Sequence, residues 1–160
     1  MRKRFSAWAR WADRACIDGL RWPGVYVLAI SDEDIAGSHF SWHRDVVYVG
    51  MTNSKGGLKS RLKQFDDTVR GKESHGGAQR VRFKHRNYEK LKHRLYVAVS
   101  NFDCEVTSNR PEDLRIMGAV ACFEFECLAA FAEVFGSLPE FNDRRRSPKK
   151  EKANKAATTK

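Results

Sequence analysis

Two short apolar runs, each flanked by turn-forming residues, constrain the fold of this 160-residue chain more than any other feature. The first run, residues 25–30, follows Pro23-Gly24, and the second, residues 46–49, ends at Gly50. Runs of this length that are rich in β-branched and aromatic residues are typical of strands. The glycine-rich turn 55–57 precedes a segment with helical spacing from Leu58. The stretch 23–61 therefore predicts two strands and a helix that bring two tyrosines and an arginine together.

Three further segments extend this arrangement. Residues 5–20 have apolar side chains at roughly helical spacing, which predicts an N-terminal amphipathic helix within residues 1–22 that packs on the domain. Residues 93–99 predict a third strand, and residues 114–135 predict a long helix after a helix start at Pro111. The predicted fold class is α/β, with a small, mainly antiparallel three-stranded sheet flanked by helices.

The polar segment 31–45 connects the first two predicted strands. Hairpin loops usually have two to five residues, so this connection is long. Two interpretations are open: an insertion that contacts a substrate, or an excursion that the fold tolerates.

The net charge of +10 narrows the class of partner. A positive field attracts polyanions, either a nucleic acid or an anionic membrane surface. No apolar run approaches the roughly 20 residues that a membrane span needs, and the basic N-terminus is not followed by an apolar signal core. We therefore expect a cytoplasmic protein whose partner is a nucleic acid and not a membrane.

Four cysteines bear on metal binding and redox state. They form no Cys-x-x-Cys pair, so a zinc site is not expected. In a reducing cytoplasm the sequence predicts free, mostly buried thiols. The four are Cys16, Cys104, Cys122 and Cys127.

Two basic segments are candidates for contact with phosphates. The segment 79–92 contains seven basic or potentially basic side chains, which suggests a face that follows a nucleic-acid backbone, although a solvated helix surface explains part of the pattern. Its candidate DNA-binding residues are Arg80, Arg82, Lys84, Arg86 and Lys90. Residues 143–160 lack apolar residues larger than alanine, which predicts a disordered basic tail.

The order of several short motifs resembles that of the GIY-YIG nuclease family. Gly24-Val25-Tyr26 is followed by Tyr48-Val49-Gly50, then by Arg61 in the next helix, Glu126 in a later helix and Pro139-Glu140-Phe141-Asn142. Each motif alone is weak, but the ordered set is fairly specific and covers about residues 23 to 142. The resemblance implies an enzyme, a metal-dependent endonuclease that hydrolyses phosphodiester bonds in DNA, with a nuclease domain at 23–142.

The resemblance also implies a role for each residue that matches a motif. Glu126 would bind a divalent cation, magnesium or manganese, and Arg61 would bind the phosphate on which negative charge develops. One of Tyr26 and Tyr48 would activate water. Because an unperturbed phenol has a pKa of about 10, either a nearby cation lowers that pKa or the phenol acts within a hydrogen-bonded water chain. Which tyrosine is the base stays open.

Several supporting roles are also open. An auxiliary cation or phosphate-binding group could be His75, Lys55 or Lys59, with an exposed loop histidine as the alternative for His75. Gly24, Gly50 and Asn142 would be structural residues near the site. The interval from Glu126 to Asn142 is longer than in compact members of the family, which keeps Glu133 as the second candidate for the metal ligand.

Two other functions fit the same sequence. One is a non-catalytic nucleic-acid-binding module that retains the nuclease fold without its activity. The other is an enzyme with the same site that cleaves RNA. All five family positions are filled, which favours an enzyme over the non-catalytic module and leaves the choice between DNA and RNA open.

Overall fold

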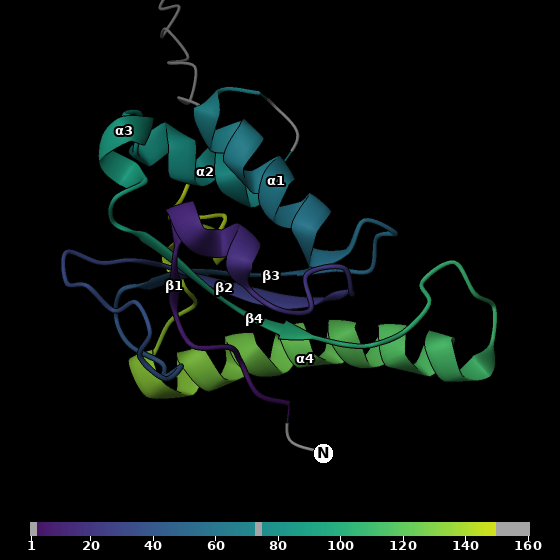
Figure 1. The fold of residues 1–160 in the computed structure, drawn as a ribbon. Helices are drawn as coiled ribbons and strands as arrows, with labels where there is room; N and C mark the ends of the chain where they lie inside the picture. The colour runs from purple at the N-terminus through teal and green to yellow at the C-terminus, as the bar shows by residue number, and fades with distance from the viewer. Residues whose placement is uncertain (1–2, 73–74, 150–160) are drawn as a thin grey trace, which may run out of the picture.

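The computed structural model describes residues 3–72 and 75–149. Its strands are β1 (Ala9–Arg10), β2 (Gly24–Ile30), β3 (Val46–Thr52) and β4 (Leu95–Asn101). Its helices are α1 (Gly57–Arg70), α2 (Gly76–Lys84), α3 (Tyr88–Leu91) and α4 (Pro111–Phe135), with 3-10 turns η1 (Trp11–Cys16) and η2 (Glu140–Asn142). Figure 1 shows helices on both sides of a sheet, which is the α/β class that the sequence predicts.

The sheet has four strands in the order β1-β4-β2-β3, and each neighbouring pair is antiparallel. The prediction of three strands is therefore one strand short. The missing strand is β1, whose two residues pair with Val97 and Tyr96 of β4. So short an edge strand leaves no alternating pattern in the sequence, so periodicity alone does not reveal it.

The predicted N-terminal helix is wrong, although the segment does pack on the domain. Residues 9–16 form β1 and η1, and the amide of Ser6 donates to the carbonyl of Val99 at 2.8 Å. Trp8 is buried in the core on one face of the sheet and Trp11 in the core on the other. A helix presents one apolar face, whereas an extended segment at the sheet edge can bury side chains on both. Trp8 and Trp11 therefore belong to two different cores, one on each face of the sheet.

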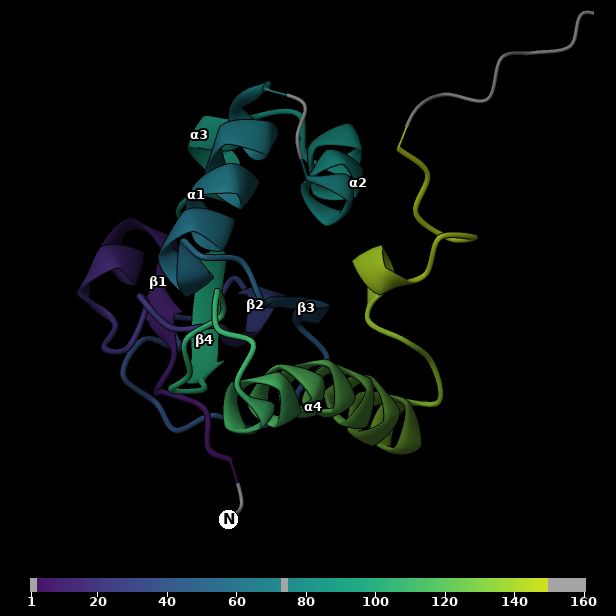
Figure 2. The same cartoon turned by 90° about the vertical axis from the view of Figure 1, so that its right-hand side faces the viewer.

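Successive side chains along each strand point to opposite faces of the sheet, so the strands contribute to two separate cores. Tyr26, Leu28 and Ile30 pack with α1 and α2, while Val25, Val27 and Ala29 pack with α4. Figure 2 shows α1, α2 and α3 on one side of the sheet and α4 on the other. Strands β1 and β3 are the two edges of the sheet.

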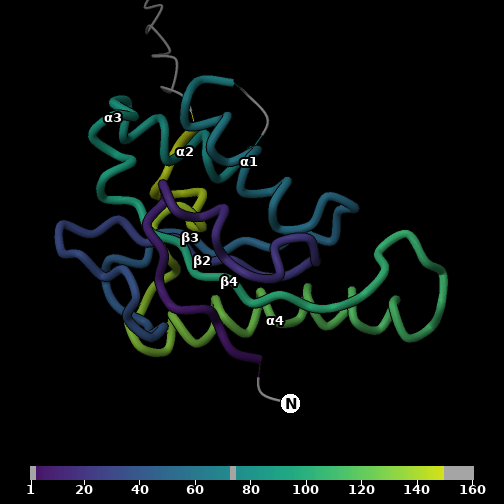
Figure 3. The backbone as a smooth tube through the Cα atoms, viewed as in Figure 1, coloured from purple at the N-terminus to yellow at the C-terminus, as the bar shows by residue number. Residues whose placement is uncertain are grey.

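The long connection 31–45 packs on the α4 face. The rings of Trp42 and Phe131 lie 6.0 Å apart, and the Arg44 guanidinium lies 5.5 Å from the ring centre of Phe135. Figure 3 shows this connection reaching the C-terminal half of α4. The segment therefore contributes aromatic side chains to the core on that face.

The predicted disordered tail at 143–160 is wrong for its first part. Residues 143–149, here called the C-terminal strap, fold back toward α2, and Ser147 is buried. The sequence pattern lacked large apolar residues, but the strap is held by hydrogen bonds instead. Residues 150–160 lie outside the described residues.

Two other expectations concern the chain as a whole. No helix within 3–72 and 75–149 is long and apolar enough to cross a membrane. All four cysteines are free: Cys104 and Cys127 are buried, whereas Cys16 and Cys122 are exposed. Burial of the thiols is therefore less general than predicted.

Candidate active site

A polar cleft of about 270 Å³ lies beside the β3 edge of the sheet. Figure 2 shows α2, α4 and the segment after α4 arranged around this edge. The side chains that line the cleft come from β3, α1, α2, α4, η2 and the C-terminal strap, so they are far apart in the sequence. They include Tyr48, Arg61, His75, Arg80, Glu124, Asn142, Arg144 and Lys149.

Strand register places both tyrosines on the face that α1 and α2 cover. Tyr26 is opposite Gly50 and Tyr48 is opposite Leu28, and the two phenol rings are 5.9 Å apart. A Cβ at Gly50 would lie 2.6 Å from the Tyr26 hydroxyl and 2.8 Å from the Tyr48 ring. A Cβ at Gly77 would lie 2.5 Å from the other edge of the Tyr48 ring. Both glycines therefore leave the space that the phenols occupy.

His75 connects α2 to Tyr26. Its Nδ1 accepts a hydrogen bond from the Ala78 amide at 3.2 Å, and its Nε2 lies 2.7 Å from the Tyr26 hydroxyl. Burial, together with the positive charges of Arg61 and Lys149, lowers the pKa of His75 to about 4. The imidazole is therefore neutral at pH 7, its proton is on Nε2, and Nε2–H donates to the Tyr26 oxygen. His75 is 1% exposed, so the alternative of an exposed loop histidine is wrong.

The two phenols differ in access to the cleft. Tyr26 is fully buried behind Tyr48, and only Tyr48 of the two lines the cleft. Burial raises the pKa of Tyr26 well above its usual value, and burial also raises that of Tyr48, against the opposing effects of Arg61 and of the hydrogen bond from Tyr26. Both phenols are therefore protonated at neutral pH in this structure.

Arg61 presents a guanidinium to the cleft from α1. Its Nη1 donates to Gln64 at 3.3 Å, while its Nε is buried and has no hydrogen-bond partner among the described residues. No ion pair to Arg61 is found within the described residues. The guanidinium also interacts with the hydroxyl of the buried Tyr26, and its charge lowers the pKa of that phenol against the effect of burial. Because Arg61 lines the cleft, its guanidinium can pair with an anion there.

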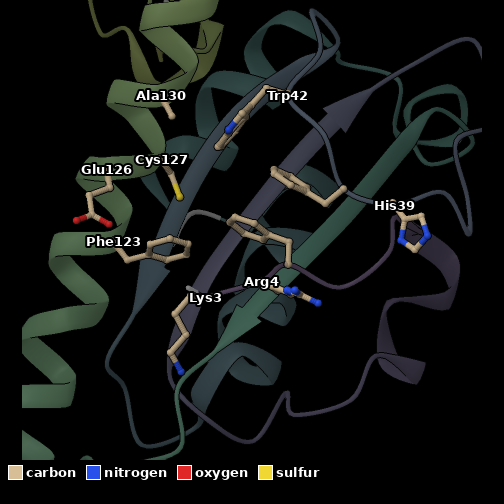
Figure 4. A pocket seen from close by; sticks show the side chains of 10 residues that line it. Lys3, Arg4, His39, Trp42, Phe123, Glu126, Cys127 and Ala130 are labelled. Carbon is tan, nitrogen blue, oxygen red and sulfur yellow. The ribbon is translucent and has the colours of Figure 1, made fainter. Parts of the chain in front are cut away.

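Glu126, which the motif order implies as the metal ligand, does not lie in this cleft. Its side chain is exposed, and it lines a different pocket of about 490 Å³ with Phe5, Phe40 and Trp42. Figure 4 shows the Glu126 carboxylate on the side of α4 that faces away from the sheet, whereas the Cys127 thiol points toward the sheet. That pocket is larger but contains neither tyrosine nor Arg61. Glu133, the second candidate, is also exposed and outside the cleft.

Glu124 is the acidic residue that lines the cleft. It is half-buried, and burial raises its pKa while the nearby Arg61 lowers it. Sequence reasoning missed it, although a signal existed. Val120, Cys127 and Phe131 are the buried stripe of α4, and Glu124 follows Val120 by four residues. A carboxylate at a position on this stripe, where apolar residues are expected, indicated that Glu124 has a charged or polar partner.

Asn142 joins η2 to the edge strand. Its Oδ1 accepts from the Val49 amide and its Nδ2 donates to the Val49 carbonyl, both at 2.8 Å. Since β3 has no further strand on this side, the Asn142 amide pairs backbone groups that would otherwise lack a partner in the sheet. The contact holds the start of the C-terminal strap against the cleft.

The other predicted site residues are dispersed. Lys55 and Lys59 are exposed and do not line the cleft. Of the candidate DNA-binding residues, Arg80 lines the cleft, whereas Lys84 pairs with Glu140 at 2.6 Å and Arg82 donates to the Gly71 carbonyl at 3.3 Å. Arg86 and Lys90 are exposed outside it. Gly24 has a packing role, because a Cβ there would lie 2.3 Å from the Ser100 carbonyl oxygen.

The donor set of the cleft limits how a metal could bind. No group of three or more His, Cys, Asp or Glu that could hold a metal occurs among residues 3–72 and 75–149. Both nitrogens of His75 are already engaged, so the Glu124 carboxylate is the available anionic ligand. One carboxylate with water and substrate phosphate oxygens is a normal set for magnesium, so the cleft fits such an ion when substrate is bound.

Comparison of the chain with protein-family models, with curated proteins and with solved structures finds no match.

Proposed function

We propose that this chain is a metal-dependent endonuclease that hydrolyses phosphodiester bonds in DNA, with a GIY-YIG-like catalytic domain at 23–142. The observation that carries the proposal is the meeting of the Tyr48 phenol, the Arg61 guanidinium and the Glu124 carboxylate in one cleft. These three groups come from separate elements of the fold. Glu124 takes the role that the motif order assigned to Glu126.

Arg61 is the phosphate-binding group of the proposed site. Its guanidinium is permanently charged, it lines the cleft, and no carboxylate among the described residues forms an ion pair with it. Two parallel N–H donors match two oxygens of a phosphate. Arg61 would therefore hold the scissile group and stabilise the negative charge that grows on its oxygens as water attacks.

Tyr48 is the candidate for handling the proton of the attacking water. The water oxygen bonds to phosphorus, and the bond from phosphorus to the leaving oxygen breaks on the opposite side. Because the raised pKa of Tyr48 keeps the phenol protonated, its oxygen accepts a proton from water while its own proton passes to a phosphoryl oxygen. The leaving oxygen takes a proton from solvent. Tyr26 and His75, joined at 2.7 Å, orient Tyr48 from behind.

Glu124 would hold the divalent cation. Magnesium or manganese, when bound, would neutralise charge on the phosphate and on the leaving oxygen. Glu124 lies near enough to Arg61 for that guanidinium to lower its pKa, so its carboxylate lies on the side of the cleft where we place the phosphate.

A plasmid-nicking assay tests this function. Purified protein is incubated with supercoiled DNA in magnesium or manganese, and with a chelator as the control. We expect nicking by the native chain and a loss of at least about 100-fold in Glu124→Gln, with DNA binding retained. Glu126→Gln is the matched control on the same helix and should cut at a rate within about twofold of the native chain, since its side chain is exposed outside the cleft.

Each alternative has its own outcome in this assay. Salt-sensitive DNA binding by a folded native chain that never nicks would favour the non-catalytic nucleic-acid-binding module. Cleavage of RNA and not DNA in a parallel reaction would change the substrate class. Loss of nicking in Glu126→Gln with normal nicking in Glu124→Gln would show that the cleft is not the active site.

A further inference from the structure

The C-terminal strap is attached to α2 and η2 by several hydrogen bonds. Arg80 Nη1 donates to the Ser147 carbonyl at 2.9 Å, and the buried Ser147 hydroxyl donates to the Glu140 carbonyl. The Ser147 amide donates to the Asp143 carbonyl at 3.0 Å. These contacts give the strap a defined path along the open side of the cleft.

The C-terminal strap contributes two cationic side chains to the wall of the cleft. Arg144 and Lys149 line the cleft together with Arg61 and Arg80. Both are exposed, and neither forms an ion pair with a carboxylate in the part of the chain that the structure describes. The Lys149 ammonium lies beside the first residue of α2, since a Cβ at Gly76 would be 3.1 Å from it.

The cleft therefore has more positive charge than one phosphodiester can balance. Four cationic side chains face one carboxylate, Glu124, so the described lining has a net charge of +3 with His75 neutral. A phosphodiester contributes a single negative charge. A strand that presents a second phosphate would lower the net charge of the lining to +1, and each pairing would release counterions.

We propose that Arg80, Arg144 and Lys149 form a second phosphate subsite, which binds a backbone phosphate next to the scissile one. The inference rests on the proposed function, because it takes the Arg61 side of the cleft as the place of the scissile phosphate. It makes the strap a part of the substrate-binding site, and it makes the substrate a strand with at least two consecutive phosphates.

Binding of small nucleotides tests the subsite without any need for cleavage. The affinity of Glu124→Gln for thymidine 3′,5′-bisphosphate is compared with its affinity for thymidine 5′-monophosphate by calorimetry. We expect the bisphosphate to bind at least about 10-fold more tightly. Adding Arg144→Gln and Lys149→Gln should remove this preference, whereas adding Lys55→Gln and Lys59→Gln, which removes the same charge outside the cleft, should preserve it.

The outcomes separate this inference from the proposed function. Equal affinity for the two nucleotides, or a preference that survives the strap substitutions, overturns the subsite. A preference that depends on the strap in a chain that fails the plasmid assay supports the subsite and removes the proposed catalysis. Nicking by a chain without the preference leaves the enzyme and removes the second phosphate.

Discussion

His75 has three separate connections in the site, and they determine its charge. Its Nδ1 caps the first turn of α2, its Nε2 meets Tyr26, and burial together with two nearby cations lowers its pKa to about 4. A protonated imidazole would lose the bond from Ala78, because Nδ1 could no longer accept. The neutral form is thus part of the folded structure.

This linkage predicts how stability depends on pH. The pKa of His75 is lowered to about 4 in the folded chain and is about 6.5 when unfolded, so the unfolded chain binds the extra proton between these values. The contribution of His75 to stability is present in full above about pH 6.5 and is lost as pH falls toward 4, by about 3 kcal/mol. Denaturant unfolding from pH 4 to 7.5 measures it. His75→Gln should show a smaller pH dependence in that window, and an unchanged one would contradict the prediction.

Gly50 is a second residue on which the site depends. An added methyl group would meet the hydroxyl of Tyr26, which cannot move because it is fully buried and bonded to His75. We expect Gly50→Ala to lower the free energy of unfolding by about 1–3 kcal/mol. Nicking should also be lost, because both phenols are displaced.

Gly118 supplies the matched control for this substitution. It lies within α4, and an added Cβ would have no atom within 4 Å. Gly118→Ala should raise the free energy of unfolding by about 0.5–1 kcal/mol and leave nicking unchanged. Chemical denaturation of both variants checks the pair. Equal stabilities would show that Gly50 is not confined by the tyrosines.

At the scale of elements, the strap differs from the helices in what holds it. The helices bury apolar faces against the sheet, whereas the described part of the strap is held mainly by hydrogen bonds from Arg80, Arg146 and Ser147. Elements with few apolar contacts open at low free-energy cost. The strap should therefore respond to the loss of a single bond.

Limited trypsin digestion tests this expectation at Arg144, Arg145 and Arg146. Ser147→Ala removes the hydroxyl that donates to Glu140, which should cost about 0.5–1.5 kcal/mol of local stability. Cleavage in the strap should then be roughly 2- to 10-fold faster, since it follows the population of the open form. Ser137→Ala, which removes a hydroxyl outside the strap, is the control. Equal digestion rates in the two variants would contradict docking through Ser147.

At the scale of the whole molecule, the cleft lies where the two helical layers approach across the β3 edge. The α1 and α2 layer supplies Arg61, His75 and Arg80, and α4 on the other face supplies Glu124. Glu124 is therefore one carboxylate in a cleft whose other charged side chains are cationic. Such a surface favours a polyanion over a neutral ligand.

Salt dependence of DNA binding follows from this charge distribution. If the four cationic side chains of the cleft each neutralise a phosphate charge, single-stranded DNA should bind roughly 50-fold more weakly at 200 mM than at 50 mM salt. Fluorescence anisotropy with Glu124→Gln measures the slope without cleavage. Arg144→Gln with Lys149→Gln should reduce the slope by about half. An affinity that does not change with salt would exclude phosphate contact as the main source of binding.

Much of the strand layer could be predicted from the sequence. The β-branched runs identified β2 and β3 and brought Tyr26 and Tyr48 to one region, and the register of the two strands places both tyrosines on the same face. The glycine-rich turn and the helical spacing after it predicted the helix that carries Arg61, whereas the role of Arg61 came from the family resemblance. The two-residue strand β1 and the hydrogen-bonded strap could not be predicted, because neither has an apolar pattern.

Tertiary structure decided which glutamate of α4 lines the cleft. Positions two apart on a helix differ by about 200° in direction, so Glu124 and Glu126 cannot share a face, and motif order alone does not choose between them. Packing of Val120, Cys127 and Phe131 on the sheet sets the rotation of α4 and brings Glu124 to the cleft. A strand has its two faces determined by its own alternation, whereas the rotation of a helix depends on the surface against which it packs.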